Sequence, residues 1–592
     1  MLDHIVGKPS ANWKRTQAAL TLLAGLWILR KGKTSQLPRP FQQFNHISAP
    51  EPLARLYKRS FYRATWILTA LDAGFFTAMP LKPMWLRHIC SVLFSFYYLV
   101  FADAAEEKVR RVRATISVEQ MRVSWEKGAT NPILACASRL LRPRFTIRKV
   151  LHIERPDYRR HLPPVEVYFY YTESPDTLAQ HDTILLQFPG GGFVSMPPPC
   201  HEDALAAWAK QTGLPVCSVN YKKAPEYPYP WPIEECFDLY VALIESRGKL
   251  LGLSGDRDLN IIVTGDSAGG NVSAAVTLKI ISHNQQLKAG FNDGSSYVMA
   301  GHEPVLGTPI PIPVGLILIY PALDFEMSCW MSPSQLSLIR AQSTTKLFRS
   351  GSLEGLWEAK DHFSHASPLS VVPDLDKPSL WQRVLGETSR KKRREGRAKP
   401  IGDRVHKFPQ TDKNAWASSR LAMTSRMGFF NDRIIPPDLM RAMAIMYLGP
   451  HNYPDFESDY LLSPVVAPLE LLAQFPKTYM MCGEKDPFVD DTVIFAGRIR
   501  QAKRQFHSNE DDVRVEFLQG ISHAFLQMMA FLPEAPQAAR AIGNWIQEMA
   551  NGVSHSPIIE SSTPITRHAV ELMTNEKDMI HRRKQQIVDG LF

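Results

Sequence analysis

The chain lacks the cysteine and histidine patterns that would indicate a disulfide framework or a zinc site. Its seven cysteines form an odd number, and no two of them lie two to four residues apart. The zinc-protease pattern HExxH is also absent. Most of the cysteines lie in apolar runs, where a thiol serves as a small hydrophobic group. This composition fits a reducing compartment and predicts no metal centre.

The sequence also lacks a hydrophobic run of the roughly 20 residues that a membrane-spanning helix needs. Three shorter apolar stretches occur in the first 150 residues, at 17–29, 64–79 and 89–102. The first runs into a basic segment with no small-residue cleavage site, which disfavours secretion.

Two interpretations of these stretches stay open: helices that cap the main core, or helices embedded in a membrane or lipid-droplet surface. Flanking cations favour the second, because they are drawn to anionic headgroups. These cations are Arg30, Lys31, Lys108, Arg110, Arg111 and Arg113. We therefore expect an intracellular protein, either associated with the cytosolic face of the endoplasmic reticulum or a lipid droplet, or cytoplasmic.

The apolar content is ordinary for a folded protein: 45% of the 592 residues are apolar, which excludes a disordered chain. The net charge of +10 is concentrated partly in the run 390–399, RKKRREGRAK. Such a run is typical of a solvated loop, with a patch for anionic lipid headgroups or a nuclear-targeting peptide as alternatives. No nucleic-acid-binding motif accompanies it, so we expect no nucleic-acid partner.

From about residue 165, short β-rich runs alternate with helical ones, which predicts a doubly wound, mostly parallel sheet with crossover helices. The expected strands are 165–171, 183–188, 216–221, 260–265, 314–320, 478–483 and 513–518. The expected helices are 202–212, 233–247, 267–282, 489–503 and 533–549.

The 157 residues between the strands 314–320 and 478–483 are too many for one crossover, which indicates an insertion. The predicted organisation is a helical, apolar N-terminal region, a first core part, an inserted helical or loop segment, a second core part and a polar tail. Their respective ranges are 1–150, 151–325, 326–445, 446–550 and 551–592.

Ser267 is the candidate nucleophile. It lies in Gly265-Asp-Ser-Ala-Gly269, directly after an expected strand and before a helical run, the setting in which GxSxG carries chemistry. The flanking glycines permit a sharp turn that exposes the hydroxyl at the end of the strand. The structural alternative is an ordinary glycine-rich helix start with Ser267 as its N-cap.

A serine nucleophile needs an imidazole to accept its proton and a carboxylate to orient that imidazole. In α/β-hydrolase chemistry the chain order is serine, acid, histidine, with the acid and the histidine each following a strand. Asp486 follows the strand 478–483, and His523 follows the strand 513–518. We favour Asp486 over the neighbouring Asp490 and Asp491, because these two suit the first turn of the next helix.

The oxyanion that forms on the substrate carbonyl needs hydrogen-bond donors. Three consecutive glycines, 190–192, follow the strand 183–188, and glycine lets backbone N–H groups approach a substrate closely. Together with Ala268, the residue after the nucleophile, Gly190 and Gly191 are the expected oxyanion-hole donors.

These motifs resemble those of the hormone-sensitive lipase family of α/β-hydrolases, most of all its fungal members. The resemblance spans Thr183 to Phe525 apart from the insertion. It is carried by PGGGFV (189–194), VNYKKAPEYPYPWPIEECFDLY (219–240), GDSAGGN (265–271), YPALDF (320–325), LLSPVVAP (461–468), GEKDPFVDD (483–491) and SHAF (522–525). It implies the α/β-hydrolase fold, the same triad and the same oxyanion donors.

Two positions depart from the family pattern. The family usually has histidine before its glycines, where this chain has Pro189, and glycine after the catalytic histidine, where it has Ala524. Proline has neither an imidazole nor an N–H, so the contact that the family's histidine makes is absent.

The sequence thus predicts a serine ester hydrolase that needs no cofactor and acts on lipid esters such as acylglycerols through an acyl-enzyme. A short-chain esterase or deacetylase of sterol or secondary-metabolite esters is the alternative within enzymes. A ligand-binding protein on the same scaffold is the alternative of another class. The oligomeric state is not indicated.

Overall fold

The computed structural model describes most of the chain from residue 57 to residue 552 and a short part of the tail. The described residues are 57–114, 117–289, 307–325, 432–450, 452, 454–456, 458–506, 512–552, 573–575 and 578–579. The first apolar stretch, 17–29, and the basic run, 390–399, lie outside them.

The described residues contain one nine-stranded sheet, with strand order β1-β2-β4-β3-β5-β6-β7-β8-β9. The strands from β4 to β8 run parallel, and β1, β2 and β9 are antiparallel to their neighbours. Their bounds are β1 Ile147–Ile153, β2 Val165–Tyr171, β3 Thr183–Phe188, β4 Val216–Val219, β5 Asn260–Asp266, β6 Gly315–Ile319, β7 Lys477–Gly483, β8 Val513–Leu518 and β9 Met573–Asn575. The predicted α/β-hydrolase fold is confirmed, and each predicted strand is present.

Two edge strands, β1 and β9, were not predicted from the sequence. In β1 the sequence IRKVLHI leaves most side chains exposed, so it lacks the continuous apolar run that marked the central strands. β9 has only three residues and pairs with β8 from within the polar tail. By contrast, every residue of β3 and β6 is buried, because helices cover both faces of the central sheet.

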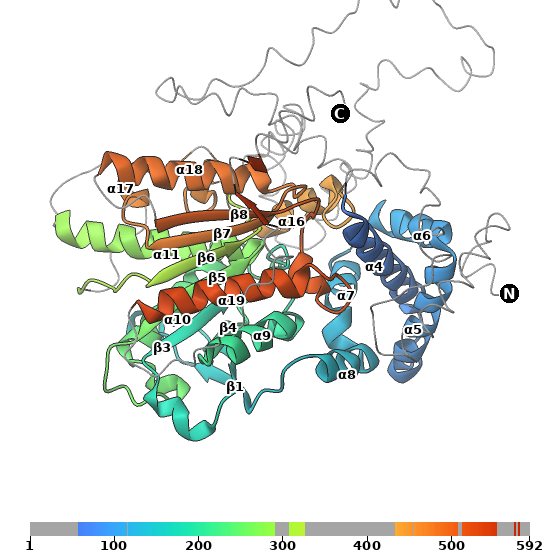
Figure 1. Ribbon diagram of the computed structural model, residues 1–592, viewed down its shortest axis with the longest axis horizontal. Helices are drawn as coiled ribbons and strands as arrows, with labels where there is room; N and C mark the ends of the chain where they lie inside the picture. The colour runs from blue at the N-terminus through green and yellow to red at the C-terminus, as the bar shows by residue number, and fades with distance from the viewer. Residues whose placement is uncertain are drawn as a thin grey trace, which may run out of the picture.

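Helices lie on both faces of the sheet (Figure 1). On one face α9 packs against α19, where the Trp208 indole N–H donates to the Ala539 carbonyl oxygen at 2.9 Å. α11 lies with α18 on the opposite face and also contacts α10. The bounds of the core helices are α9 Glu202–Thr212, α10 Trp231–Glu245, α11 Ala268–Ala289, α16 Pro437–Leu448, α17 Leu469–Leu472, α18 Val489–Gln505 and α19 Ala535–Asn551.

The predicted N-terminal helical region forms a separate layer at one end of the sheet (Figure 1). Its helices are α4 Arg59–Ala78, α5 Met84–Val100, α6 Ala102–Ala114, α7 Val118–Thr130 and α8 Pro132–Leu141. The start of α4 joins the main core through Phe61 and Ala64, whereas its later turns form a small cluster of their own with α5 and α6. Among the described helices none combines the length and the apolar character needed to cross a membrane.

The end of the predicted insertion belongs to the core. α16 lies within the range 326–445 up to its last turn, and its Met440 and Met443 are buried in the main core. The earlier part of the insertion, up to residue 431, lies outside the described residues.

Candidate active site

Ser267 lies in a sharp turn between β5 and α11. Its φ of +54° is in the left-handed region, which is strained for a residue with a side chain. The turn also requires glycine at position 269, because a Cβ there would collide with the Phe188 carbonyl group. The strained turn places the Ser267 hydroxyl at the carboxyl end of the parallel strands.

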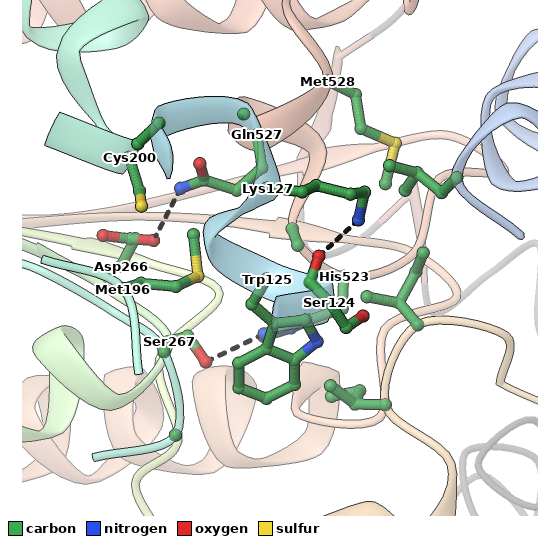
Figure 2. Close-up of a pocket in the computed structure, with 18 of the residues that line it drawn as sticks. Ser124, Trp125, Lys127, Met196, Cys200, Asp266, Ser267, His523, Gln527 and Met528 are labelled. Atoms are coloured by element: carbon green, nitrogen blue, oxygen red, sulfur yellow. Dashed lines mark hydrogen bonds between the residues drawn. The ribbon is translucent and has the colours of Figure 1, made fainter. Parts of the chain in front are cut away.

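The structure brings Ser267, His523 and Asp486 together in one hydrogen-bonded chain. His523 Nε2 lies 2.9 Å from Ser267 Oγ (Figure 2). Its Nδ1 lies 2.9 Å from Asp486 Oδ2. Asp486 is almost fully buried, and its other oxygen accepts the N–H of Phe488 at 2.9 Å. These contacts fix the imidazole so that Nε2 can accept the serine proton, as a nucleophile–base–acid triad requires.

Aromatic rings and a left-handed residue hold the histidine loop in place. The rings of Tyr320 and Phe488 lie edge-on to the His523 imidazole, at 4.7 and 5.3 Å between ring centroids. Ala524 has a φ of +57°, in the left-handed region that glycine adopts most easily. Alanine at this position therefore carries backbone strain.

The glycine loop differs from prediction at one donor. The N–H of Gly190 donates to Asp266 Oδ1 at 3.1 Å, so it is not available to a substrate oxyanion. Gly191, Gly192 and Ala268 line the pocket, and within the described residues their N–H groups have no acceptor. The Gly190 N–H, an expected oxyanion donor, is thus already bonded to Asp266, whereas Gly192, which the prediction left out, lines the pocket with Gly191 and Ala268.

Asp266, which the sequence reasoning passed over, organises this loop. Its carboxylate lies 3.3 Å from His201 Nδ1 and accepts the side-chain amide of Gln527 at 3.4 Å (Figure 2). Burial alone would raise the pKa of Asp266, but His201 and the Gly190 N–H outweigh burial and lower it. The one feature of the sequence that could have pointed to Asp266 is its position directly before the nucleophile Ser267.

Helix α7 of the N-terminal layer holds the segment that follows the glycines. Glu126 Oε1 accepts the hydroxyl of Ser195 at 2.9 Å and the N–H of Met196 at 3.1 Å. Arg122 donates to the Val194 carbonyl oxygen at 3.0 Å. Helix α7, which lies outside the three apolar stretches, therefore fixes the segment that follows the three glycines.

A pocket of about 530 Å³ adjoins Ser267 and His523. Apolar side chains from several elements line it, among them Trp125, Phe193, Phe325, Met443 and Phe531. Its size is typical of a small-molecule site. In the described parts of the chain no cluster of three or more histidine, cysteine or acidic side chains could hold a metal ion.

Comparisons with known proteins agree with this geometry. The family model described as the α/β-hydrolase fold matches residues 185–376 and 405–527. The chain is 24% identical to hormone-sensitive lipase of Homo sapiens over 425 residues, which cover 62% of this chain and 38% of that protein. The bovine (Bos taurus) hormone-sensitive lipase is also 24% identical over 422 residues, covering 62% of this chain and 53% of that protein.

A bacterial relative is similar over a shorter segment. Lipase 2 of Moraxella is 30% identical over 164 residues, which cover 27% of this chain and 37% of that protein. The matches thus span from about a third to about half of the length of these relatives. The chain belongs to the hormone-sensitive lipase family of α/β-hydrolases.

Proposed function

We propose that this protein is a serine-dependent carboxylic ester hydrolase that acts on lipid esters such as acylglycerols. The observation that carries the proposal is the continuous hydrogen-bonded chain from Ser267 through His523 to Asp486. Ser267, at one end of this chain, lines a largely apolar pocket to which Gly191, Gly192 and Ala268 also contribute. The named lipases among its relatives support the same reaction.

In this mechanism Ser267 Oγ attacks the ester carbonyl carbon while His523 Nε2 accepts its proton. Asp486 stabilises the imidazolium, and the amides of Gly191, Gly192 and Ala268 stabilise the oxyanion. The imidazolium then protonates the leaving alcohol, which leaves an acyl-enzyme. His523 next activates a water molecule, which attacks the acyl-enzyme and releases the carboxylic acid.

The pocket lining favours esters with a substantial apolar part. Large apolar side chains from the N-terminal layer, the glycine loop and α16 meet in it, so a hydrocarbon chain would be removed from water on binding. Association with a membrane or lipid-droplet surface is part of this proposal, since such substrates reside there.

Substitution of the nucleophile tests the proposal. Ser267→Ala is expected to lower kcat on a chromogenic acyl ester by about four orders of magnitude or more. Ser254→Ala, which truncates an exposed serine, is the control and should keep full turnover. Near-complete activity of Ser267→Ala would refute the mechanism, and a preference for acetyl over long-chain esters would refute the lipid substrate.

A further inference from the structure

Helix α5 turns a stripe of large apolar side chains toward solvent. Trp85, Ile89, Leu93 and Phe96 are spaced four, four and three residues apart, which places them on one helix face. Their exposed fractions are 66%, 43%, 59% and 56%. The opposite face of α5 contacts α4, where Ser91, Ser95 and Tyr98 are buried. Large apolar side chains thus lie on the solvent face of α5 as well as on the face that packs against the protein, unlike on an ordinary surface helix.

Helix α8 contacts α5 and extends this apolar surface. Ile133, Leu140 and Leu141 of α8 are exposed, the last two by 78% and 74%. Eight of the twelve large apolar side chains that are exposed in the described residues lie on these two helices. Isolated exposed apolar residues are normal, but a cluster of this kind marks an interaction site.

The segments that carry this surface contain cations and no acidic residue. Residues 73–102 include Lys82 and Arg87 but no aspartate or glutamate. Residues 127–153 include six cations and likewise no acidic residue. Among these cations Lys82, Arg139, Arg144, Arg148 and Lys149 are exposed, and Arg148 pairs with Glu202 of α9. The charge pattern is complementary to an anionic surface.

The active-site pocket reaches the surface beside α8. Most of its lining is buried or half-buried, and its exposed members mark the rim. These are Gly128, Ala137, Arg139, Leu141, Arg148 and Ala530. Three of them belong to α8, and Leu141 contributes both to the rim and to the exposed apolar surface.

We propose that α5 and α8 form a lipid-docking face that lies on an anionic phospholipid surface and delivers ester substrate directly into the pocket. The face consists of Trp85, Ile89, Leu93, Phe96, Leu140 and Leu141, with the exposed cations around it. This proposal adds a site of lipid contact to the proposed function, and it takes the identity of the substrate from that function. The helices lie in the interface without crossing it, as a helix with one apolar face does.

A second copy of the chain is a poorer occupant of this face. A two-fold symmetric contact brings the same patch against itself, so the cations of one copy would face the cations of the other. Glu202 and Asp203 of α9 offset Arg142 and Arg148. Residues 73–102 and 127–153 offer no carboxylate to offset the other exposed cations, Lys82, Arg139, Arg144 and Lys149, so this contact would be repulsive. A phospholipid surface supplies both the apolar interior and the negative charge.

Vesicle binding of the full chain tests the lipid-docking face. Leu93→Ser combined with Phe96→Ser should lower the partition to vesicles containing about 30% phosphatidylserine by about tenfold or more. The matched control combines Leu250→Ser with Phe506→Ser, which are exposed by 46% and 44% elsewhere on the molecule, and should bind as the unmodified chain does. Omitting phosphatidylserine should weaken binding of the unmodified chain as well.

Activity separates the docking proposal from the catalytic one. The Leu93→Ser/Phe96→Ser chain should hydrolyse a water-soluble butyrate ester at the unmodified rate, while its turnover of diacylglycerol in vesicles falls about tenfold. The Ser267→Ala chain should be inactive on both substrates yet bind vesicles normally.

Unchanged vesicle binding by the Leu93→Ser/Phe96→Ser chain would overturn the docking proposal. If the sedimentation coefficient of this variant were also lower than that of the unmodified chain, the face would be assigned to a second copy.

Discussion

The sheet-centred core and the N-terminal layer both bury ion pairs but differ in the apolar side chains that they expose. Arg155 and Asp238 form a buried pair in the core, as Lys127 and Asp72 do in the layer. The central strands of the core are apolar and buried on both faces. In the layer, by contrast, large apolar side chains of α5 and α8 are exposed. This difference is what the proposed lipid-docking face explains.

The largest expected effect concerns the core. Asp486→Asn leaves the size of the buried side chain unchanged but removes the charge that holds the His523 tautomer. We expect kcat on a soluble ester to fall by about four orders of magnitude, with the thermal midpoint little changed. Stopped assays on purified protein measure the first quantity and calorimetry the second. Retention of more than a tenth of the activity would show that Asp486 does not orient the base.

The next effect concerns the buried charges of the N-terminal layer. Asp72 accepts hydrogen bonds from Lys127 Nζ at 2.8 Å and Ser124 Oγ at 2.7 Å, joining α4 to α7. Asp72→Ala leaves the lysine charge buried without its partner, so we expect the free energy of unfolding to drop by about 3 to 5 kcal/mol. Chemical denaturation measures this change.

An exposed ion pair of the same layer provides the control. Glu107 pairs with Arg111 on α6 at 2.7 Å, and Glu107→Ala should lower the free energy of unfolding far less than Asp72→Ala does. Equal losses for Asp72→Ala and Glu107→Ala would contradict the contrast between buried and exposed charges in this layer.

A smaller effect tests whether the layer serves catalysis. Glu126→Ala on α7 removes the acceptor for Ser195 and Met196, which anchor the segment after the oxyanion glycines. We expect kcat on a soluble ester to fall about tenfold while vesicle binding is kept, because the donors lose alignment. Glu119→Ala, exposed on the same helix, should leave kcat unchanged. If both variants match the unmodified enzyme, α7 only covers the core.

The smallest effect concerns the residue after the catalytic histidine. Ala524→Gly relieves the left-handed strain of alanine but increases the entropy of the unfolded chain. Because these contributions oppose each other, we expect the free energy of unfolding to change by less than about 1 kcal/mol. A loss above about 2 kcal/mol, measured by chemical denaturation, would show that the Ala524 methyl group contributes packing.

The sequence predicted the central strands and the close approach of Ser267, Asp486 and His523 because each has a strong local signal. A buried parallel strand is a continuous apolar run, and each of the three residues follows such a run. Strand β1 was missed because an exposed edge strand has no such run.

Features that depend on distant partners could not be read from local patterns. Gly190 looked equivalent to its neighbours until the fold brought Asp266 to its N–H. In the same way, Met440 and Met443 reach the pocket from the end of the predicted insertion. The apolar run of α5 was visible in the sequence, but which of its faces meets solvent depends on α4 and α8.

The hydrogen-bonded triad is tested most directly by treating the full chain with a fluorophosphonate and locating the adduct by peptide mass spectrometry. The triad predicts one adduct, on Ser267, which His523→Ala abolishes, because only a serine activated by the imidazole is phosphonylated rapidly. A chain that stays unlabelled, or that is labelled equally with and without His523, would contradict it.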